Sequence, residues 1–180
     1  MPIILAGLTV VSILVRLLPH PANFTPIAAL ALFSGVYFSK RWSWIFPLAA
    51  MLVSDSIIGF YDARLMAAVY GSLLLPVLIS RVIRKNKNFI SITGVSLVGS
   101  ILFFLITNFA VWLYSPLYPY TSSGLAQSYI AGLPFFRNTV LGDLFWAGVF
   151  FGCYALALKL ARPMRAPFSV SLIEQKTQDS

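Results

Sequence analysis

Six long apolar stretches, separated by short polar breaks, make up most of this 180-residue chain. They cover residues 3–18, 24–39, 43–60, 63–80, 89–114 and 130–161. Only 10% of the residues are charged, against about 25% in an ordinary soluble chain, so a water-soluble globule would lack the polar surface it needs. Since about 20 apolar residues cross a bilayer as a helix, the sequence predicts an all-α integral membrane protein, a six-helix transmembrane bundle.

The breaks between the stretches are turn and charge signals. Pro19-His20-Pro21 interrupts any helix after the first stretch, and residues 81–88 form the clearest loop. The first stretch would be about 24 Å long against a hydrocarbon core of about 30 Å, so either it spans alone or it forms a re-entrant element with the second. Residues 115–128 are too polar for lipid and are expected to be an outer loop. We expect one domain over residues 1–165 and a disordered cytoplasmic tail over 166–180.

Basic residues distinguish the two faces of such a bundle. With six spans, one face carries three, which are Arg16, Arg64 and Arg137. The other carries ten, which are Lys40, Arg41, Arg81, Arg84, Lys85, Lys87, Lys159, Arg162, Arg165 and Lys176. The positive-inside rule then predicts cytoplasmic termini and a multi-pass protein of the cell inner (cytoplasmic) membrane. Basic clusters at helix ends are typical of contact with lipid headgroups, so the net charge of +8 does not indicate nucleic-acid binding.

Polar side chains within the predicted helices gather toward the outer face. A charge near the bilayer centre costs about 2.5–3.5 kcal/mol, so each one must be compensated or used. If Pro134 occupies the first position of the last helix, the polar residues that follow it also lie on the outer side. The predicted substrate-binding residues are Asp55, Tyr70, Asn108, Trp112, Arg137, Asn138 and Asp143, with Asn23 and Tyr118 nearer the mouth.

The inner halves of the predicted helices hold only small hydroxyls, Cys153 and Tyr154. This asymmetry predicts a pocket open to the outside above a sealed apolar half, whereas a channel would need polar lining throughout. A few directed polar groups among aromatic residues are typical of small-molecule binding, and Arg137 would suit a carboxylate or phosphate. The alternative is that Asp55, Arg137 and Asp143 only neutralise one another and hold the third and sixth stretches together.

Two other functional classes stay open. An intramembrane hydrolase would need Asp55 and Asp143 within hydrogen-bonding reach of each other. A structural subunit of a membrane complex would use the small-residue pairs Ala67/Gly71 and Gly148/Gly152, for which packing within the chain is the first expectation. With one cysteine and no phosphate-binding loop, the sequence indicates no metal, no cofactor and no nucleotide site, and we expect no enzymatic activity.

Two segments carry a resemblance to a known family. Residues 16–30 (RLLPHPANFTPIAAL) and 134–143 (PFFRNTVLGD) resemble a family of small, uncharacterised bacterial membrane proteins regarded as transport proteins. That family is similar in size, helix number and cytoplasmic termini to the S components of energy-coupling factor (ECF) vitamin transporters.

The resemblance implies a substrate-binding importer subunit. Such a protein captures a vitamin or micronutrient beneath its first and third loops and topples beside an energising module, a transmembrane coupling subunit with ATPases. The chain departs from S components in two places. Val10 follows Ala6 where their docking pattern Ala-xxx-Ala has its second alanine, and residues 59–64 lack the cysteine that solitary cobalamin-transporting relatives use as a cobalt ligand.

Overall fold

The computed structural model describes residues 2–38 and 40–161, and within these ranges it contains helices and no strands. The helices are α1 (Pro2–Leu17), α2 (Ile27–Tyr37), α3 (Lys40–Ile58), α4 (Ala63–Ile79), α5 (Phe89–Tyr114) and α6 (Ser122–Leu160). The predicted all-helical class and the order of six helices are confirmed. The tail predicted over residues 166–180 lies outside the described residues, as do Arg162, Arg165 and Lys176 and the side chains of Lys40 and Arg41.

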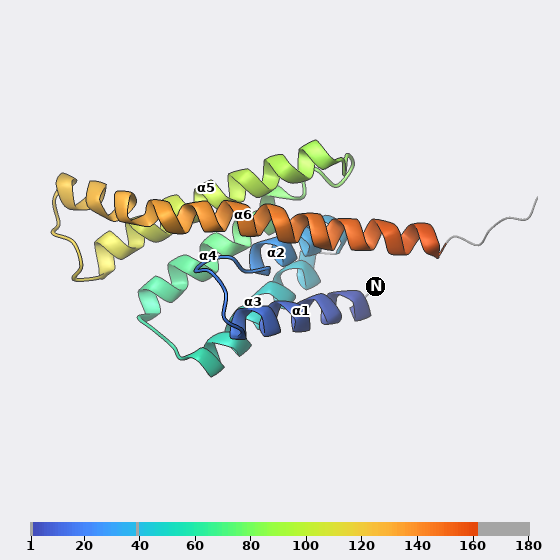
Figure 1. Ribbon diagram of the computed structural model, residues 1–180, viewed down its shortest axis with the longest axis horizontal. Coiled ribbons are helices and arrows are strands. Elements are labelled where there is room, and N and C mark those ends of the chain that lie inside the picture. Colours follow the sequence, from blue (N-terminus) through green and yellow to red (C-terminus); the bar gives the residue numbers. More distant parts are fainter. Residues whose placement is uncertain (1, 39, 162–180) are drawn as a thin grey trace, which may run out of the picture.

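Helix α2 lies at the centre of the molecule and contacts all five other helices (Figure 1). The two long helices α5 and α6 pack side by side over it, and α1 and α3 pack beneath it. The connections 18–26, 59–62 and 115–121 lie at one end, which we call the loop end, on the left in Figure 1. The start of α1, the connection 80–88 and the end of α6 lie at the opposite end.

Helix α2 is short and buried, although the sequence predicts a longer second helix. Nine of its eleven residues are buried, so it packs against protein on all sides. It begins only after Pro26, because prolines keep the preceding connection from becoming helical. At its other end Arg84 donates hydrogen bonds to the carbonyls of Gly35 (2.8 Å) and Phe38 (2.5 Å). A side chain from a distant loop thus satisfies carbonyls that a helix end leaves without partners.

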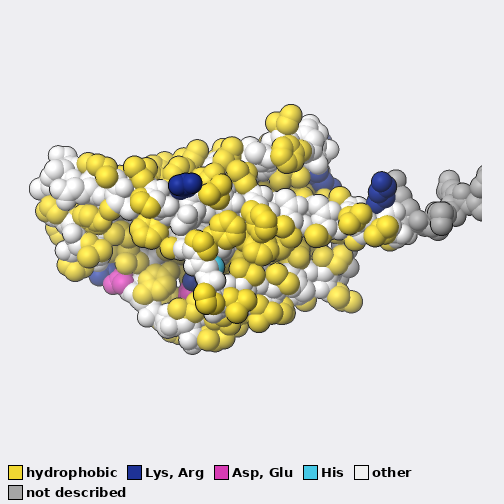
Figure 2. Space-filling view, in the orientation of Figure 1, with side chains coloured by type: hydrophobic (Ala, Val, Ile, Leu, Met, Phe, Trp, Pro, Cys, Tyr) yellow, Lys and Arg dark blue, Asp and Glu magenta, His cyan; other side chains and the backbone are white. Residues whose placement is uncertain are grey.

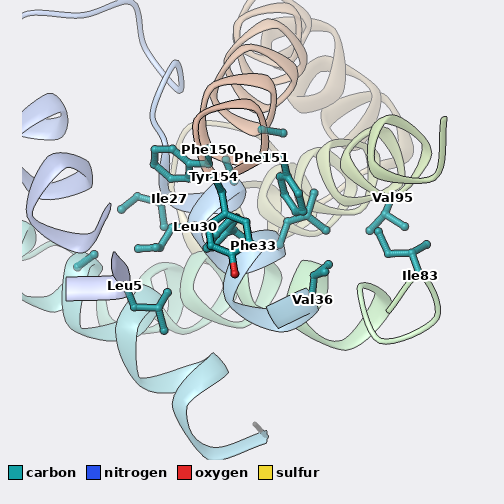
Figure 3. Packing of buried hydrophobic residues seen from close by; sticks show 14 of the residues in the cluster. Leu5, Ile27, Leu30, Phe33, Val36, Ile83, Val95, Phe150, Phe151 and Tyr154 are labelled. Carbon is teal, nitrogen blue, oxygen red and sulfur yellow. The ribbon is translucent and has the colours of Figure 1, made fainter. Parts of the chain in front are cut away.

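An aromatic cluster joins α2 to α6 in the half of the molecule away from the loop end (Figure 3). Phe33 is fully buried, and its ring centre lies 5.2 Å from that of Phe151 and 5.3 Å from that of Tyr154. Tyr37 packs 4.6 Å from Tyr154 in the same cluster. Edge-on rings at these distances are favourable arrangements and fill space densely. The space between α2 and α6 is therefore filled by packed side chains.

Helix α6 is longer than the sequence predicts. It starts at Ser122 rather than near residue 130, because the Thr121 hydroxyl caps it by accepting a hydrogen bond from the Gly124 N–H. Pro134 therefore lies inside the helix and not at its first position. At 1.5 Å per residue the 39-residue helix is about 58 Å long, and the irregular connection shrinks to residues 115–121.

The surface of the described part is largely hydrophobic (Figure 2). Many large apolar side chains are exposed on α1, α3, α5 and α6, and soluble monomers rarely show continuous apolar surface of this extent. Two helices, α5 and α6, are long and apolar enough to cross a membrane. The other four are apolar but shorter or carry more charge. Length and composition thus favour a membrane protein.

The small residues singled out in the sequence do not pack inside the chain. A Cβ atom added at Gly71, Gly148 or Gly152 would meet no atom of the chain within 4 Å. The expectation that these glycines permit close helix approach within the chain is wrong, because α6 packs through the bulky side chains of Phe150 and Phe151 instead. The close approach occurs at Gly35, where an added Cβ would lie 2.9 Å from the backbone of Val77.

We predict that Gly35→Ala destabilises the protein by about 1–3 kcal/mol, because the new methyl group would overlap the backbone of α4. Thermal unfolding of the purified protein in one detergent measures this. Gly71→Ala is the matched control, since its methyl group enters open space and alanine favours a helix over glycine by about 1 kcal/mol. Equal unfolding temperatures for the two variants would contradict the central packing of α2.

Candidate functional site

A buried ion pair joins three helices near the loop end. Arg16 Nη2 lies 2.6 Å from Asp55 Oδ1, and the Tyr70 hydroxyl donates a hydrogen bond to Asp55 Oδ2 at 2.6 Å. Arg16 Nη1, the other terminal nitrogen of the guanidinium, donates a hydrogen bond to Ser54 Oγ at 2.6 Å. Asp55 is 1% exposed and Arg16 17% exposed, so the pair is shielded from water. It connects the end of α1 to α3 and, through Tyr70, to α4.

The position of this pair follows from helix ends. Arg16 occupies the last turn of α1, where a cation is favoured by the helix dipole, and Asp55 lies one turn before the end of α3. Helices α1 and α3 both end at the loop end and pack against each other, so residues near their C-terminal ends lie at a similar depth. Of the predicted site residues, the structure thus brings Asp55 and Tyr70 together, and it adds Arg16, which the sequence analysis used only to count charges.

Asp143 has different surroundings. It is 4% exposed on α6 and accepts a hydrogen bond from the Ser100 hydroxyl of α5 at 2.6 Å. Within residues 2–38 and 40–161 no ion pair involves Asp143, and no hydrogen bond joins it to Asp55 or Arg137. The sequence alternative, in which Asp55, Arg137 and Asp143 neutralise one another, is therefore wrong. Asp55 forms its ion pair with Arg16, and Asp143 accepts its hydrogen bond from Ser100.

A cavity of about 80 Å³ separates these two groups, and we call it the deep cavity. Residues from all six helices and from the connection 18–26 line it, with Leu73 and Phe103 among its apolar walls. Its polar lining residues are Arg16, Asn23, Thr25, Ser72, Thr139 and Asp143. Two charged residues and several hydroxyls thus face one small space, which is an arrangement typical of sites that orient a small ligand.

A second cavity of about 350 Å³, which we call the mouth cavity, continues from the first toward the loop end. The two share Asn23, Val69 and Phe103 as lining residues, so they adjoin. Asn108 and Tyr118 line the mouth cavity, as the sequence predicts for residues near an outer pocket. Its volume falls within the range of about 300–1,000 Å³ of pockets that hold drug-sized ligands.

Asn23 is placed between the cavities by a tight turn. Its φ of 64° is in the left-handed region, which asparagine tolerates better than most residues, and the Phe24 N–H donates to the Pro21 carbonyl at 3.0 Å. The next residue crosses α6 closely at Gly142, where an added Cβ would lie 3.0 Å from the Phe24 Cα. The connection 18–26 therefore forms part of the cavity wall beside Asp143.

Five predicted site residues line neither cavity: Asp55 and Tyr70, which belong to the buried ion pair, and Trp112, Arg137 and Asn138. Trp112 donates its indole N–H to the Pro119 carbonyl at 3.0 Å and packs on Tyr120, so it holds the connection 115–121 in place. Arg137 is exposed on the outer surface of α6, and Asn138 is half-buried. Arg137 points away because α6 turns Thr139 and Asp143 toward the deep cavity, and residues two apart on a helix lie on different faces.

A charge cluster at the rim ties the loop end together. Asp62 caps α4 by accepting from the N–H groups of Arg64 and Leu65, and Arg64 Nη2 lies 3.1 Å from Asp62 Oδ2. The Arg64 guanidinium also lies 5.1 Å from the centre of the Tyr114 ring at the end of α5. Its hydrogen bond to Asp62, more than the backbone hydrogen bonds, lowers the pKa of that carboxyl, which stays charged at neutral pH.

Sequence reasoning missed the hydroxyl groups of the site and the role of Arg16. Ser72, Ser100 and Thr139 are small residues in apolar helices, where they are common, so nothing marked them individually. For Arg16 a signal was present, because Arg16 and Asp55 lie at similar distances from the ends of α1 and α3 at the loop end. Matching charges by depth would have suggested the pair.

Comparison with known proteins identifies one family. Residues 1–166 match the family described as "Family of unknown function (DUF6580)". No curated protein and no solved structure matches the chain.

We predict that Arg16→Met or Asp55→Leu alone destabilises the protein by about 3–5 kcal/mol, because each leaves a buried charge without its partner. The double variant should lose much less than the sum, which unfolding measurements on all four proteins in one detergent will show. Arg64→Met is the control, since the Arg64–Asp62 pair is exposed and its loss should hardly change stability. Strictly additive effects of Arg16→Met and Asp55→Leu would refute the coupling.

Proposed function

Because the chain belongs to this family of unknown function, we propose its role from its geometry: it is the substrate-binding, multi-pass membrane subunit of a small-molecule importer. The observation that carries this proposal is the pair of adjoining cavities at the loop end, which contain directed polar groups. Away from the loop end, the aromatic cluster packs between α2 and α6, where the two cavities do not extend. A pocket that opens at one end suits capture of a substrate, not free conduction.

In this proposal the chain is a six-helix transmembrane bundle with cytoplasmic termini. Helices α5 and α6 are long enough to cross the bilayer, and α1, α3 and α4 have apolar exposed faces and 16 to 19 residues. Helix α2 is only about 16 Å long, so it completes its crossing through the connection 18–26. The loop end then faces outward, and the basic connection 80–88 faces the cytoplasm of the cell inner membrane.

The substrate proposed is a vitamin-like or micronutrient-like small molecule taken from outside. The chain contains no phosphate-binding loop, so the energy for release comes from a partner, which the resemblance to S components suggests is an ECF-type module. The hydrolase alternative receives no support from the geometry, since Asp55 and Asp143 hydrogen-bond to different groups.

The orientation can be tested with single cysteines. In a Cys153→Ser background, Leu117→Cys places a thiol in the connection 115–121, and Lys85→Cys places one in the connection 80–88, both at exposed positions. We expect a membrane-impermeant maleimide to label Leu117→Cys in intact cells and Lys85→Cys only after the membrane is opened. The opposite pattern, or labelling of both in intact cells, would contradict the proposed topology.

Ligand binding can be tested with matched threonine variants. The protein is purified in mild detergent, co-eluting small molecules are identified by mass spectrometry, and their affinities are measured. Thr139→Val removes a hydroxyl from the deep cavity and should weaken binding about two- to tenfold, the worth of a neutral hydrogen bond. Thr9→Val removes a buried hydroxyl of α1 that lines neither cavity and should leave affinity unchanged.

The structural-subunit alternative makes a different prediction in the same experiment. It is favoured by a groove of about 420 Å³ between the start of α5 and the second half of α6, lined in part by Gly148 and Gly152, which have open space beside them. A constitutive protein partner that stays bound in mild detergent, together with no small molecule that binds, would support it and refute the importer proposal.

A further inference from the structure

The charges around the deep cavity do not balance. Arg16 is neutralised by Asp55 at 2.6 Å, whereas Asp143 has only a hydroxyl partner among the described residues. Arg16 and Asp143 are the charged residues that line the deep cavity. Asp55 does not line it but neutralises Arg16, so the three groups together carry one net negative charge. A carboxylate that is 4% exposed in apolar surroundings is costly unless a positive charge or a proton neutralises it.

The hydroxyl groups of the cavity add to this preference. Ser72 donates its proton to the Val69 carbonyl at 2.9 Å, and Thr139 donates to the Phe135 carbonyl at 2.9 Å. Since each hydroxyl has one proton and two acceptor lone pairs, both groups offer lone pairs to a ligand. The Ser100 proton is used by Asp143. The space beside Asp143 is therefore rich in acceptors and suits a group that brings several N–H donors with a positive charge.

Size sets a further limit. The deep cavity is about 80 Å³, which admits a small head group, while the mouth cavity is about 350 Å³ and has aromatic side chains on its wall. Phe103 lines both cavities, and Phe135 and Tyr118 line the mouth. A ligand that fills both cavities thus has a compact head and a larger, uncharged body.

We propose that the substrate is a small organic cation whose ammonium group occupies the deep cavity with Asp143 as its counter-ion, while its body lies in the mouth cavity. This inference rests on the proposed importer function and names the substrate class. It differs from the expectation that Arg137 selects a carboxylate or phosphate, since Arg137 is exposed and lines neither cavity. Arg16 lines the deep cavity, but its charge is already paired with that of Asp55.

The test compares ligands that differ in charge and little in shape. The full-length protein in detergent is titrated with benzylamine, benzyl alcohol and benzoate, with a wider panel of primary amines and matched alcohols and acids, and with sodium and potassium chloride. Thermal shift and calorimetry report binding. We expect amines to bind at least tenfold more tightly than their matched alcohols and acids.

Variants assign this preference to one carboxylate. Asp143→Asn should lose amine affinity at least tenfold while its unfolding temperature in the absence of ligand is maintained or raised, because a buried charge without a cation is removed. Asp62→Asn is the matched control, because that carboxylate is exposed at the rim and lines neither cavity, and asparagine also caps helices. It should bind amines as the wild type does.

Each other outcome has a defined meaning. Equal or tighter binding of alcohols or acids, a shift with sodium or potassium ions alone, or an Asp143→Asn variant that binds amines normally would overturn the proposed substrate class. If a neutral or anionic molecule co-purifies and binds, the importer function stands and only this inference fails. If no molecule of any charge binds the wild-type protein, both proposals fail.

Discussion

Charges buried in an apolar helical body need partners within the chain, and this requirement organises the loop end of the molecule. The Arg16–Asp55 pair meets it for α1 and α3, and the Tyr70 hydroxyl extends the contact to α4. Removing either charge alone leaves the other without compensation, so the three helices depend on one another at this point. Asp143 lies on the opposite side of the deep cavity with no cation among the described residues, and the chemistry of the site follows from that difference.

Helix α2 lies at the centre of the bundle and contributes Ala28 to the wall of the deep cavity. A short helix buried on all sides must have its end groups satisfied by other parts of the chain, and Arg84 does this for its carbonyls from a loop far along the sequence. Because α2 is short, the connection 18–26 reaches into the bundle and places Asn23 beside the cavity. The aromatic cluster around Phe33 fills the space between α2 and α6 in the other half.

The candidate site was partly predictable. Asp55, Tyr70, Asn108 and Asp143 stand out because polar residues are rare in this chain, and they do lie toward the loop end, in or beside the cavities. Arg137 stands out for the same reason but is exposed on α6. Composition cannot separate these cases, since a helix with apolar residues on every face gives no sign of which face turns inward. The hydroxyls of Ser72 and Thr139 were not predictable, because such residues are common in apolar helices.

By itself, the sequence determined that the chain is helical, the order of its six helices, and the gathering of its polar residues near one end. These are local properties, set by apolar length, by prolines and by capping residues such as Asp62 and Asn88. The tertiary structure alone decided that α2 is the buried centre, that α6 begins at Ser122, that Arg16 partners Asp55, and that Asp143 faces a cavity without an ion-pair partner among the described residues. Such outcomes depend on how helices rotate and slide against one another, and packing between distant segments sets this where the local sequence does not.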